Sequence, residues 1–220
     1  PLAAGEHEVD LIVVTDSEGI LGIGDQGVGG VAIAVGKLSV YVAAAGIHPN
    51  RVLPVVLDTG TDNLDLLNDP AYLGVRHSRV RGEAYDSFID RFVTELTAAF
   101  PNAMIHWEDF AAANAHRILN RYRDEVCSFN DDIQGTAAVV VAAVLSGIRA
   151  NHSSLAEQRI VIHGAGSAGI GIANLLVDLM VAEGMDPEKA KSRFWGLSSR
   201  GLCLRGGQLR DFQEPYARDP

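Results

Sequence analysis

A glycine-rich turn in the second half of the chain constrains its fold more than any other feature. The sequence RIVIH over residues 159–163 is typical of a short buried strand, and a helical pattern follows over residues 168–182. Between them stands GAGSAG, which has the G-x-G-x-x-G spacing in the strand-turn-helix context of a dinucleotide site. We therefore predict a Rossmann-type unit that holds pyrophosphate at a helix N-terminus; a tight turn without a ligand is the alternative. The predicted cofactor-binding residues of this turn are Gly164, Ala165, Gly166, Ser167, Ala168 and Gly169.

The choice between NAD and NADP is expected at the end of the next strand, residues 194–199. An acid at this position would bind the ribose hydroxyls in the NAD pattern. The sequence here is Leu-Ser-Ser-Arg, and the hydroxyl of Ser198 with the cation of Arg200 suits a 2′-phosphate. This favours acceptance of NADP beside NAD, and it also fits an NAD enzyme whose ribose contact lies elsewhere.

Two pairs of adjacent acids stand on loops that follow apolar segments. Asp131 and Asp132 lie within CSFNDDIQGT, and Glu108 and Asp109 lie within HWEDF at the end of a predicted strand. Hard divalent cations such as Mg²⁺ and Mn²⁺ prefer carboxylate oxygens, so a shared cation would explain all four acids. The alternative is that the acids cap neighbouring helices, because Asp is a preferred N-cap residue.

A single lysine interrupts an otherwise apolar helical pattern over residues 29–45. Lys37 is the only formally charged residue between Asp25 and Arg51. Desolvation lowers the pKa of a lysine, which is how such a residue becomes a general base near neutral pH. We interpret Lys37 as a candidate catalytic base; the alternative is a lysine that extends to the surface from a partly exposed helix.

The remaining patterns predict an α/β fold in two parts. We expect a parallel-sheet domain for substrate and metal over residues 1–131, and an incomplete Rossmann-type domain over residues 132–220. The apolar helices over residues 29–45 and 136–150 are expected to be buried on most sides. The other predicted strands cover residues 9–14, 20–23, 52–57 and 103–106, and the other predicted helices cover residues 83–100 and 111–124.

Composition restricts the partners and the compartment. The formal net charge of −10 argues against nucleic acid or an anionic membrane as a partner, and two widely spaced cysteines indicate a reduced, cytoplasmic protein. The apolar stretch over residues 31–46 is short for a bilayer span and contains a lysine. We expect the chain to be an internal piece of a longer protein that forms a homo-oligomer.

Several blocks of this sequence together resemble the malic enzyme family of oxidative decarboxylases. The matching blocks are VVTDSEGILGIGDQG, GKLSVY, LPVVLDTGTDN, HWEDF, RYRDEVCSFNDDIQGTAA and GAGSAGIGIA. The resemblance implies oxidation and decarboxylation of malate to pyruvate and CO₂, with NAD or NADP and with Mn²⁺ or Mg²⁺ as cofactors. It implies Glu108, Asp109 and Asp132 as metal ligands, with Lys37 as the base and Asp131 beside it.

The sequence also departs from the family pattern. An arginine commonly follows the TDxE motif of malic enzymes, and this chain has Gly19 there. The wording EGILGIGD is similar to the malolactic branch, whose members convert malate to lactate and CO₂ with NAD kept bound. The catalytic tyrosine and late asparagines that the family implies are absent from the 220 residues. A malolactic enzyme and a non-catalytic nucleotide-binding fragment are therefore the alternative functions.

Overall fold

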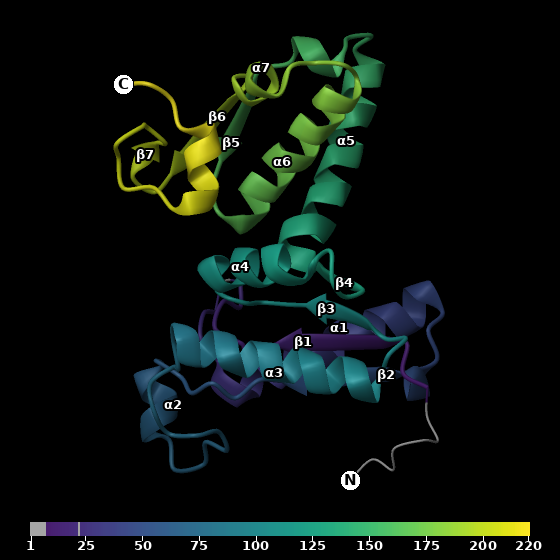
Figure 1. The fold of residues 1–220 in the computed structure, drawn as a ribbon, viewed down its shortest axis with the longest axis vertical. Helices are drawn as coiled ribbons and strands as arrows, with labels where there is room; N and C mark the ends of the chain where they lie inside the picture. The colour runs from purple at the N-terminus through teal and green to yellow at the C-terminus, as the bar shows by residue number, and fades with distance from the viewer. Residues whose placement is uncertain (1–7, 22) are drawn as a thin grey trace. The chain divides into compact units, whose positions relative to one another are not determined.

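The computed structural model describes residues 8–21 and 23–220, and the chain divides into two compact units, Pro1–Phe129 and Asn130–Pro220. The first unit contains a four-stranded sheet in the order β2-β1-β3-β4 (Figure 1). Strand β1 (Leu11–Thr15) is fully buried and lies parallel to both β2 (Val52–Val56) and β3 (Met104–Trp107). Strand β4 (Ser128–Asn130) forms the other edge. The parallel α/β architecture is thus confirmed.

Consecutive residues of β3 contact helices on opposite faces of this sheet, as the alternation of side chains along a strand requires. His106 contacts Tyr41 of α1 (Val31–Ala45). Trp107 contacts Phe92 of α3 (Glu83–Ala99) and Tyr122 of α4 (Ala112–Tyr122). Helix α1 therefore covers one face, while α3 and α4 cover the other. A short helix, α2 (Leu64–Asn68), lies in the loops of this unit.

The second unit is built on a three-stranded sheet in the order β5-β6-β7 (Figure 1). Strand β5 (Ile160–His163) lies parallel to β6 (Phe194–Ser198), and the short β7 (Gly201–Leu202) returns antiparallel. Its helices are α5 (Thr136–Ala150), α6 (Ser167–Ala182) and α7 (Pro187–Lys191). Buried side chains of α6 form much of the apolar core, together with Val141, Leu155, Phe194 and Tyr216.

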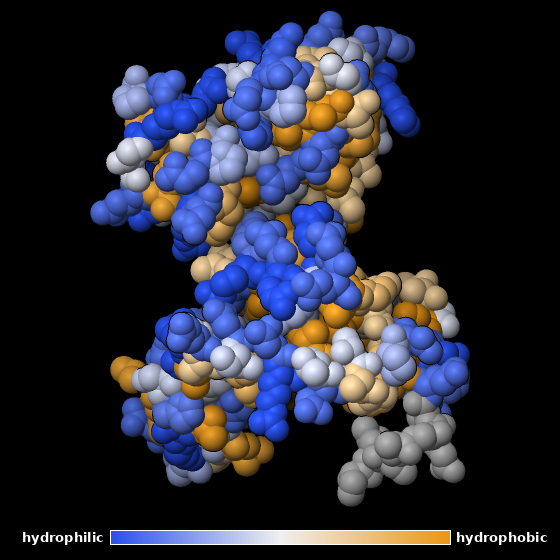
Figure 2. Space-filling model, viewed as in Figure 1, coloured by the Kyte–Doolittle hydropathy of each residue, from blue (hydrophilic) through white to orange (hydrophobic). Residues whose placement is uncertain are grey.

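Three predictions about these elements are wrong. A strand was predicted over residues 20–23; Gly22 lies outside the described residues, and the others form a turn in which one bridge joins Ile20 to Gly24, whose φ is +72°. Helices α1 and α5 were expected to be buried on most sides, and each buries only two side chains within the described chain. In α1 these are Ala34 and Leu38, which pack on β1. Figure 2 shows apolar surface over α5 and α6, and Val139 of α5 is 73% exposed.

Two helical stretches, Gly27–Ala45 and Asp131–Ala150, are long and apolar enough to cross a membrane by length and composition alone. This corrects the estimate that the first stretch is too short, because a 3-10 turn, Gly27–Gly30, extends α1 at its N-terminal end. Core helices of α/β proteins have the same length and composition. In this chain α1 packs on the sheet through Ala34 and Leu38, and it carries Lys37 between them.

Candidate active site

Two adjacent acids lie at the carboxyl end of β3, where ligands of open α/β sheets bind. Glu108 and Asp109 are each 5% exposed. The N–H of Glu108 donates to the carbonyl of Val14, which extends the sheet pairing by one residue. Asp109 has φ +55°, a conformation that is costly for a residue with a Cβ. Two buried carboxylates are thus held at this edge, although the backbone conformation of Asp109 lowers the stability of the fold.

The alternative role of these acids as helix caps is wrong. Helix α4 begins at Ala112 with Ala111 at its N-cap, so neither Glu108 nor Asp109 occupies the N-cap position. Because capping does not explain Glu108 and Asp109, their burial calls for another explanation. Two buried carboxylates are an oxygen donor set that fits Mg²⁺ or Mn²⁺.

Lys37 contacts one of these acids. Its Nζ lies 3.1 Å from Oε1 of Glu108, and the lysine side chain is 29% exposed while that of Glu108 is 6% exposed. Lys37 therefore does not simply extend into solvent, as the alternative interpretation assumed. The structure brings the candidate base from α1 to the acid that follows β3.

The second oxygen of the same carboxylate is also engaged. Nε2 of His106 lies 2.5 Å from Oε2 of Glu108, and Nδ1 of His106 lies 3.0 Å from the hydroxyl of Tyr41. His106 is completely buried. Tyr41 stands one helical turn after Lys37 on α1, so α1 contacts the β3 segment at both ends of this chain of hydrogen bonds.

The other pair of acids opens the second unit. Residues Asp131–Gly135 form a π-helical turn that leads into α5, and such turns often occur at functional sites. Asn130 is the N-cap, because its side-chain oxygen accepts the N–H of Ile133 at 2.9 Å. The interpretation of Asp131 as the cap is therefore wrong. Oδ1 of Asp131 lies 2.1 Å from where a Cβ of Gly135 would stand, so a side chain at this position would require the Asp131 carboxylate to move.

The turn is anchored within its own unit. The side-chain oxygen of Gln134 accepts the N–H of Asn130 at 3.0 Å. The carbonyl of Ile133 lies 2.4 Å from the position of a Cβ on Gly171 of α6, so only glycine permits this approach. Asp131 and Asp132 belong to this unit, whereas Lys37, Glu108 and Asp109 belong to the first. The pairing of Lys37 with Asp131 and the shared cation stay predictions.

The glycine-rich turn has the geometry that its spacing predicts. Gly164 has φ +110°, which a side chain would oppose, and Gly166 is the N-cap of α6. A Cβ on Gly169 would stand 2.2 Å from the carbonyl oxygen of Gly164, so the third glycine permits close packing of turn and helix. A Cβ on Gly164 or Gly166 would meet no described atom within 4 Å. The turn therefore fits a pyrophosphate, which approaches the backbone on this open side.

The end of β6 has a tight hairpin to β7. Oγ of Ser198 accepts the N–H of Arg200 at 3.1 Å and lies 3.3 Å from the carbonyl oxygen of Gly201. One guanidinium N–H of Arg200 donates to the carbonyl of Gln208 at 2.5 Å. Both side chains are therefore held at the strand end where the ribose of a dinucleotide binds.

A buried ionic network, which no sequence pattern indicated, surrounds the loop after β1. Both oxygens of Asp25 accept hydrogen bonds from the guanidinium of Arg79, at 2.7 and 2.8 Å. Burial opposes ionisation of Asp25, but Arg79 and two backbone N–H groups lower its pKa to about 2. Asp16 is 1% exposed, and burial raises its pKa to about 6 although Tyr85 donates to it. The partners of each pair are far apart in the sequence, so no local sequence pattern indicates that they interact.

Gly19 lies against the loop that carries the β3 acids. Its N–H donates to the carbonyl of Asp109 at 3.0 Å. A Cβ on Gly19 would stand 2.6 Å from the carbonyl oxygen of Phe110. Gly19, which stands where the resemblance led us to expect an arginine, therefore lies in close backbone contact with this loop. A side chain at this position would disrupt the contact.

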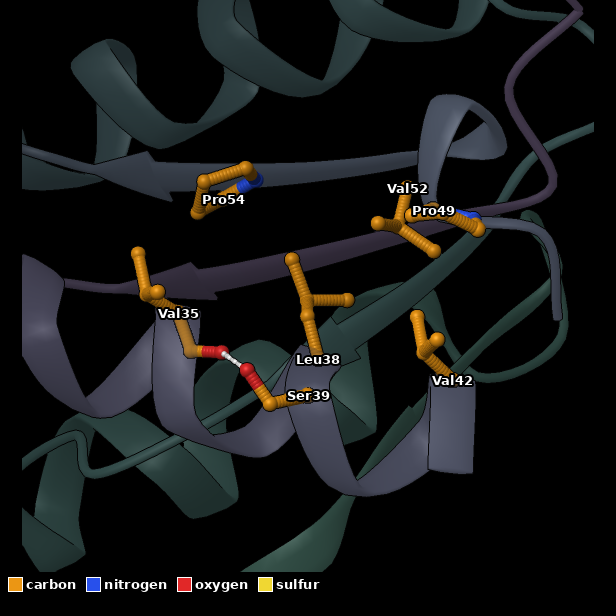
Figure 3. Close-up of a pocket in the computed structure, with 7 residues that line it drawn as sticks. All are labelled: Val35, Leu38, Ser39, Val42, Pro49, Val52 and Pro54. Atoms are coloured by element: carbon orange, nitrogen blue, oxygen red, sulfur yellow. Dashed lines mark hydrogen bonds between the residues drawn. The ribbon is translucent and has the colours of Figure 1, made fainter. Parts of the chain in front are cut away.

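An apolar groove of about 360 Å³ lies between α1 and β2 in the first unit (Figure 3). Ser39 is its only polar lining side chain, and Oγ of Ser39 donates to the carbonyl of Val35 on the same helix at 2.9 Å. The lining contains no acid or base, so the groove has none of the ionisable groups that Lys37, Glu108 and His106 bring to the candidate active site. Its lining residues are Val35, Leu38, Ser39, Val42, Pro49, Val52 and Pro54.

Comparisons with known proteins agree on one family. The family profile "Malic enzyme, N-terminal domain" matches residues 2–123, and "Malic enzyme, NAD binding domain" matches residues 133–220. The chain is 60% identical to NAD-dependent malic enzyme 3 of Bacillus subtilis, over 96% of this chain and 37% of that protein. It is 50% identical to the mitochondrial NAD-dependent malic enzyme of Saccharomyces cerevisiae, over 97% of this chain and 32% of that protein.

A solved structure shows the same fold. The NAD-dependent malic enzyme of Thermotoga maritima superimposes with a TM-score of 0.69 at 24% identity, over 96% of this chain and 48% of that chain. The chain thus spans 32% to 48% of the lengths of these three relatives. Two family profiles match nearly all of its residues in the expected order. The chain belongs to the malic enzyme family.

Proposed function

We propose that this chain carries the catalytic centre of an enzyme that converts malate and NAD(P)⁺ to pyruvate, CO₂ and NAD(P)H with a divalent cation. The contact between Nζ of Lys37 and Oε1 of Glu108 supports this most strongly. It joins a candidate base to a buried acid that does not cap a helix. The similar proteins named NAD-dependent malic enzymes support the same reaction class.

In this proposal each group of residues has one task. Glu108 and Asp109 of the first unit and Asp132 of the second supply carboxylate oxygens to Mn²⁺ or Mg²⁺. Nζ of Lys37 accepts the proton of the C2 hydroxyl of malate, and Asp131 stands beside it. The glycine-rich turn, residues 164–169, holds the pyrophosphate of the dinucleotide at the N-terminus of α6. Ser198 and Arg200 contact the adenosine ribose or its 2′-phosphate.

The balance of the reaction fits these tasks. A cation held by Glu108, Asp109 and Asp132 would supply a Lewis acid to malate, and the nicotinamide would supply a hydride acceptor. The C2 hydrogen leaves as hydride and the hydroxyl proton passes to Lys37. The bond between C3 and the β-carboxylate then breaks, CO₂ leaves, and a proton returned to C3 completes pyruvate.

Gly19 favours one further candidate, the malolactic reaction, in which the cofactor stays bound and lactate is the product. Absorbance at 340 nm with malate, Mn²⁺ and NAD⁺ or NADP⁺ separates the two on the full-length protein. Net formation of reduced cofactor supports the malic enzyme reaction. Lactate without net reduced cofactor would replace it with the malolactic reaction.

Replacement of Lys37 tests whether the chain has a catalytic centre at all. Lys37→Ala should reduce turnover by about 10²- to 10⁴-fold, the usual contribution of a positioned base, with dinucleotide affinity retained. Exposed Lys189→Ala, in the second unit, is the matched control and should keep wild-type turnover. A Lys37→Ala protein with unaltered turnover would remove Lys37 as the base, whereas an unaltered full-length protein that does not turn over malate would favour a non-catalytic nucleotide-binding module.

A further inference from the structure

His106 lies between two residues that connect it to the candidate active site from opposite sides. Nδ1 of its ring is 3.0 Å from the hydroxyl of Tyr41, and Nε2 is 2.5 Å from Oε2 of Glu108. The ring meets Tyr41 edge-on, with the two ring centroids 5.6 Å apart, and lies 4.6 Å from the ring of Phe129. A fully buried ring between these neighbours has little freedom to turn.

Chemistry fixes the direction of these hydrogen bonds. An ionised carboxylate only accepts, so Nε2 of His106 must carry the hydrogen that is donated to Glu108. In the neutral imidazole Nδ1 is then an acceptor, and the hydroxyl of Tyr41 donates to it. We assign this tautomer from the hydrogen-bond network. The other oxygen of Glu108 faces Nζ of Lys37 at 3.1 Å.

We propose that His106, held by Tyr41, is a positioning residue that fixes the orientation of Glu108 for cation binding. The proposal rests on the proposed function, in which Glu108 is a cation ligand. Carboxylates that bind metals are commonly oriented by a hydrogen bond from a neighbouring group, and loss of that group weakens the metal. His106 supplies this hydrogen bond from β3, and Tyr41 joins it to α1, the helix of Lys37.

A histidine that merely fills the core does not account for this arrangement. Core packing needs only the shape of the ring, which Phe129 and Tyr41 already surround. Both ring nitrogens are instead engaged, one by an acid that is itself only 5% exposed. A buried polar chain of this kind orients its members because each hydrogen bond restricts the next.

The test is Mn²⁺ affinity of the full-length protein, measured from the electron paramagnetic resonance signal of free Mn²⁺. His106→Phe keeps a ring and removes the donor, so the Kd for Mn²⁺ should rise about 10- to 100-fold. His106→Gln keeps an N–H donor for Glu108 and should recover most of the affinity. Tyr41→Phe removes one hydroxyl, folds with the least disturbance, and should raise the Kd in the same direction by a smaller factor.

Two further variants separate positioning from packing. Tyr41→Phe combined with His106→Phe should bind Mn²⁺ no more weakly than His106→Phe alone, because Tyr41 acts through His106. Phe129→Leu loosens the packing of the ring and leaves both hydrogen bonds, so it should keep wild-type Mn²⁺ affinity. NAD⁺ affinity, which depends on the second unit, should be unchanged in every variant, and thermal unfolding of the full-length protein verifies that the first unit is folded.

Each outcome gives a decision. Wild-type Mn²⁺ affinity in both His106→Phe and Tyr41→Phe would overturn the positioning role and leave the proposed function standing. A loss in Phe129→Leu as large as that in His106→Phe would assign the effect to packing and also overturn it. A wild-type protein that binds no Mn²⁺ would overturn the proposed function, and the positioning role with it.

Discussion

The side-chain oxygen of Asn130 accepts the backbone N–H of Ile133 at 2.9 Å, and this hydrogen bond caps the helical segment that begins at Asp131. The residue before the two acids therefore does the work that the acids could have done. Asp131 and Asp132 are left on a π-helical turn with carboxylates that the cap does not use. This relationship removes the simplest structural reason for the Asp-Asp pair and strengthens its assignment to chemistry.

Replacement of the cap should affect stability where replacement of the acid does not. Asn130→Ala should lower the free energy of unfolding by about 1 kcal/mol, the usual cost of a lost N-cap. Asn130→Asp keeps an acceptor oxygen and should restore most of this loss. Denaturant unfolding of the full-length protein measures both, with Asp131→Ala as the comparison. A loss of stability in Asp131→Ala as large as that in Asn130→Ala would return Asp131 to the role of cap.

Sequence alone could not choose between these neighbouring residues. Asn and Asp have nearly equal preferences for the N-cap position, so the run Asn130-Asp131-Asp132 permits three choices. Only the backbone geometry selects one. The glycine-rich turn, by contrast, was predictable in detail, because the closeness of Gly169 to the carbonyl of Gly164 is a local property of the spacing.

Burial of the apolar helices was not predictable either. The composition of α1 and α5 indicates apolar helices, but it does not say how many neighbours cover them. Within the described chain each helix buries two side chains. The ionic network of Asp25 and Arg79 was missed for a related reason, since 54 residues separate its partners and no local period connects them.

A side chain at position 19 should be poorly tolerated. Gly19→Ala places a Cβ 2.6 Å from the carbonyl oxygen of Phe110, so the backbone must move at a cost of about 1–3 kcal/mol. Gly19→Arg should lose at least as much stability, and it should not tighten malate binding. Gly29→Ala is the control, because a Cβ there meets no described atom within 4 Å. Thermal unfolding and the KM for malate measure the two effects; an arginine that lowers the KM without loss of stability would contradict this.

Asp16 should make stability depend on pH. Burial raises its pKa from 3.8 to about 6, so the folded protein holds this proton more tightly than the unfolded chain. The stabilisation is complete below pH 3.8 and is lost as the pH rises through 6. By linkage, the total loss in the free energy of unfolding is up to about 3 kcal/mol. Asp16→Asn carries no charge at any pH and lacks this loss.

The advantage of Asp16→Asn over wild type should therefore grow between pH 4 and pH 7. Denaturant unfolding measures this difference in the free energy of unfolding. The fluorescence of Trp107, which is buried in the same structural unit as Asp16, follows the transition. Asp124→Asn, which replaces an exposed acid, should show no such trend. A difference between Asp16→Asn and wild type that is constant with pH would contradict the raised pKa.

Cofactor preference should respond to the end of β6. The hydroxyl of Ser198 and the cation of Arg200 suit a 2′-phosphate, so kcat/KM with NADP should be at least comparable to that with NAD. Ser198→Asp places a negative charge there and should shift the ratio toward NAD by about tenfold or more, since like charges in contact cost several kcal/mol. Ser192→Asp, in the same unit and outside the strand end, should leave the ratio unchanged. A strong NAD preference in the unaltered protein would contradict the role of Ser198 and Arg200.

The most direct test of the account is Asp132→Asn in the full-length protein, which removes one proposed cation ligand and keeps the size of the side chain. The Asn130 cap and the packing of Ile133 on α6 do not use this carboxylate, so the turn should keep its structure. We expect Mn²⁺-dependent turnover of malate to be abolished while the Kd for NAD⁺ stays within about twofold of wild type, a change below 0.5 kcal/mol. An Asp132→Asn protein with wild-type turnover and wild-type dependence on Mn²⁺ would contradict the assignment of this loop to the cation.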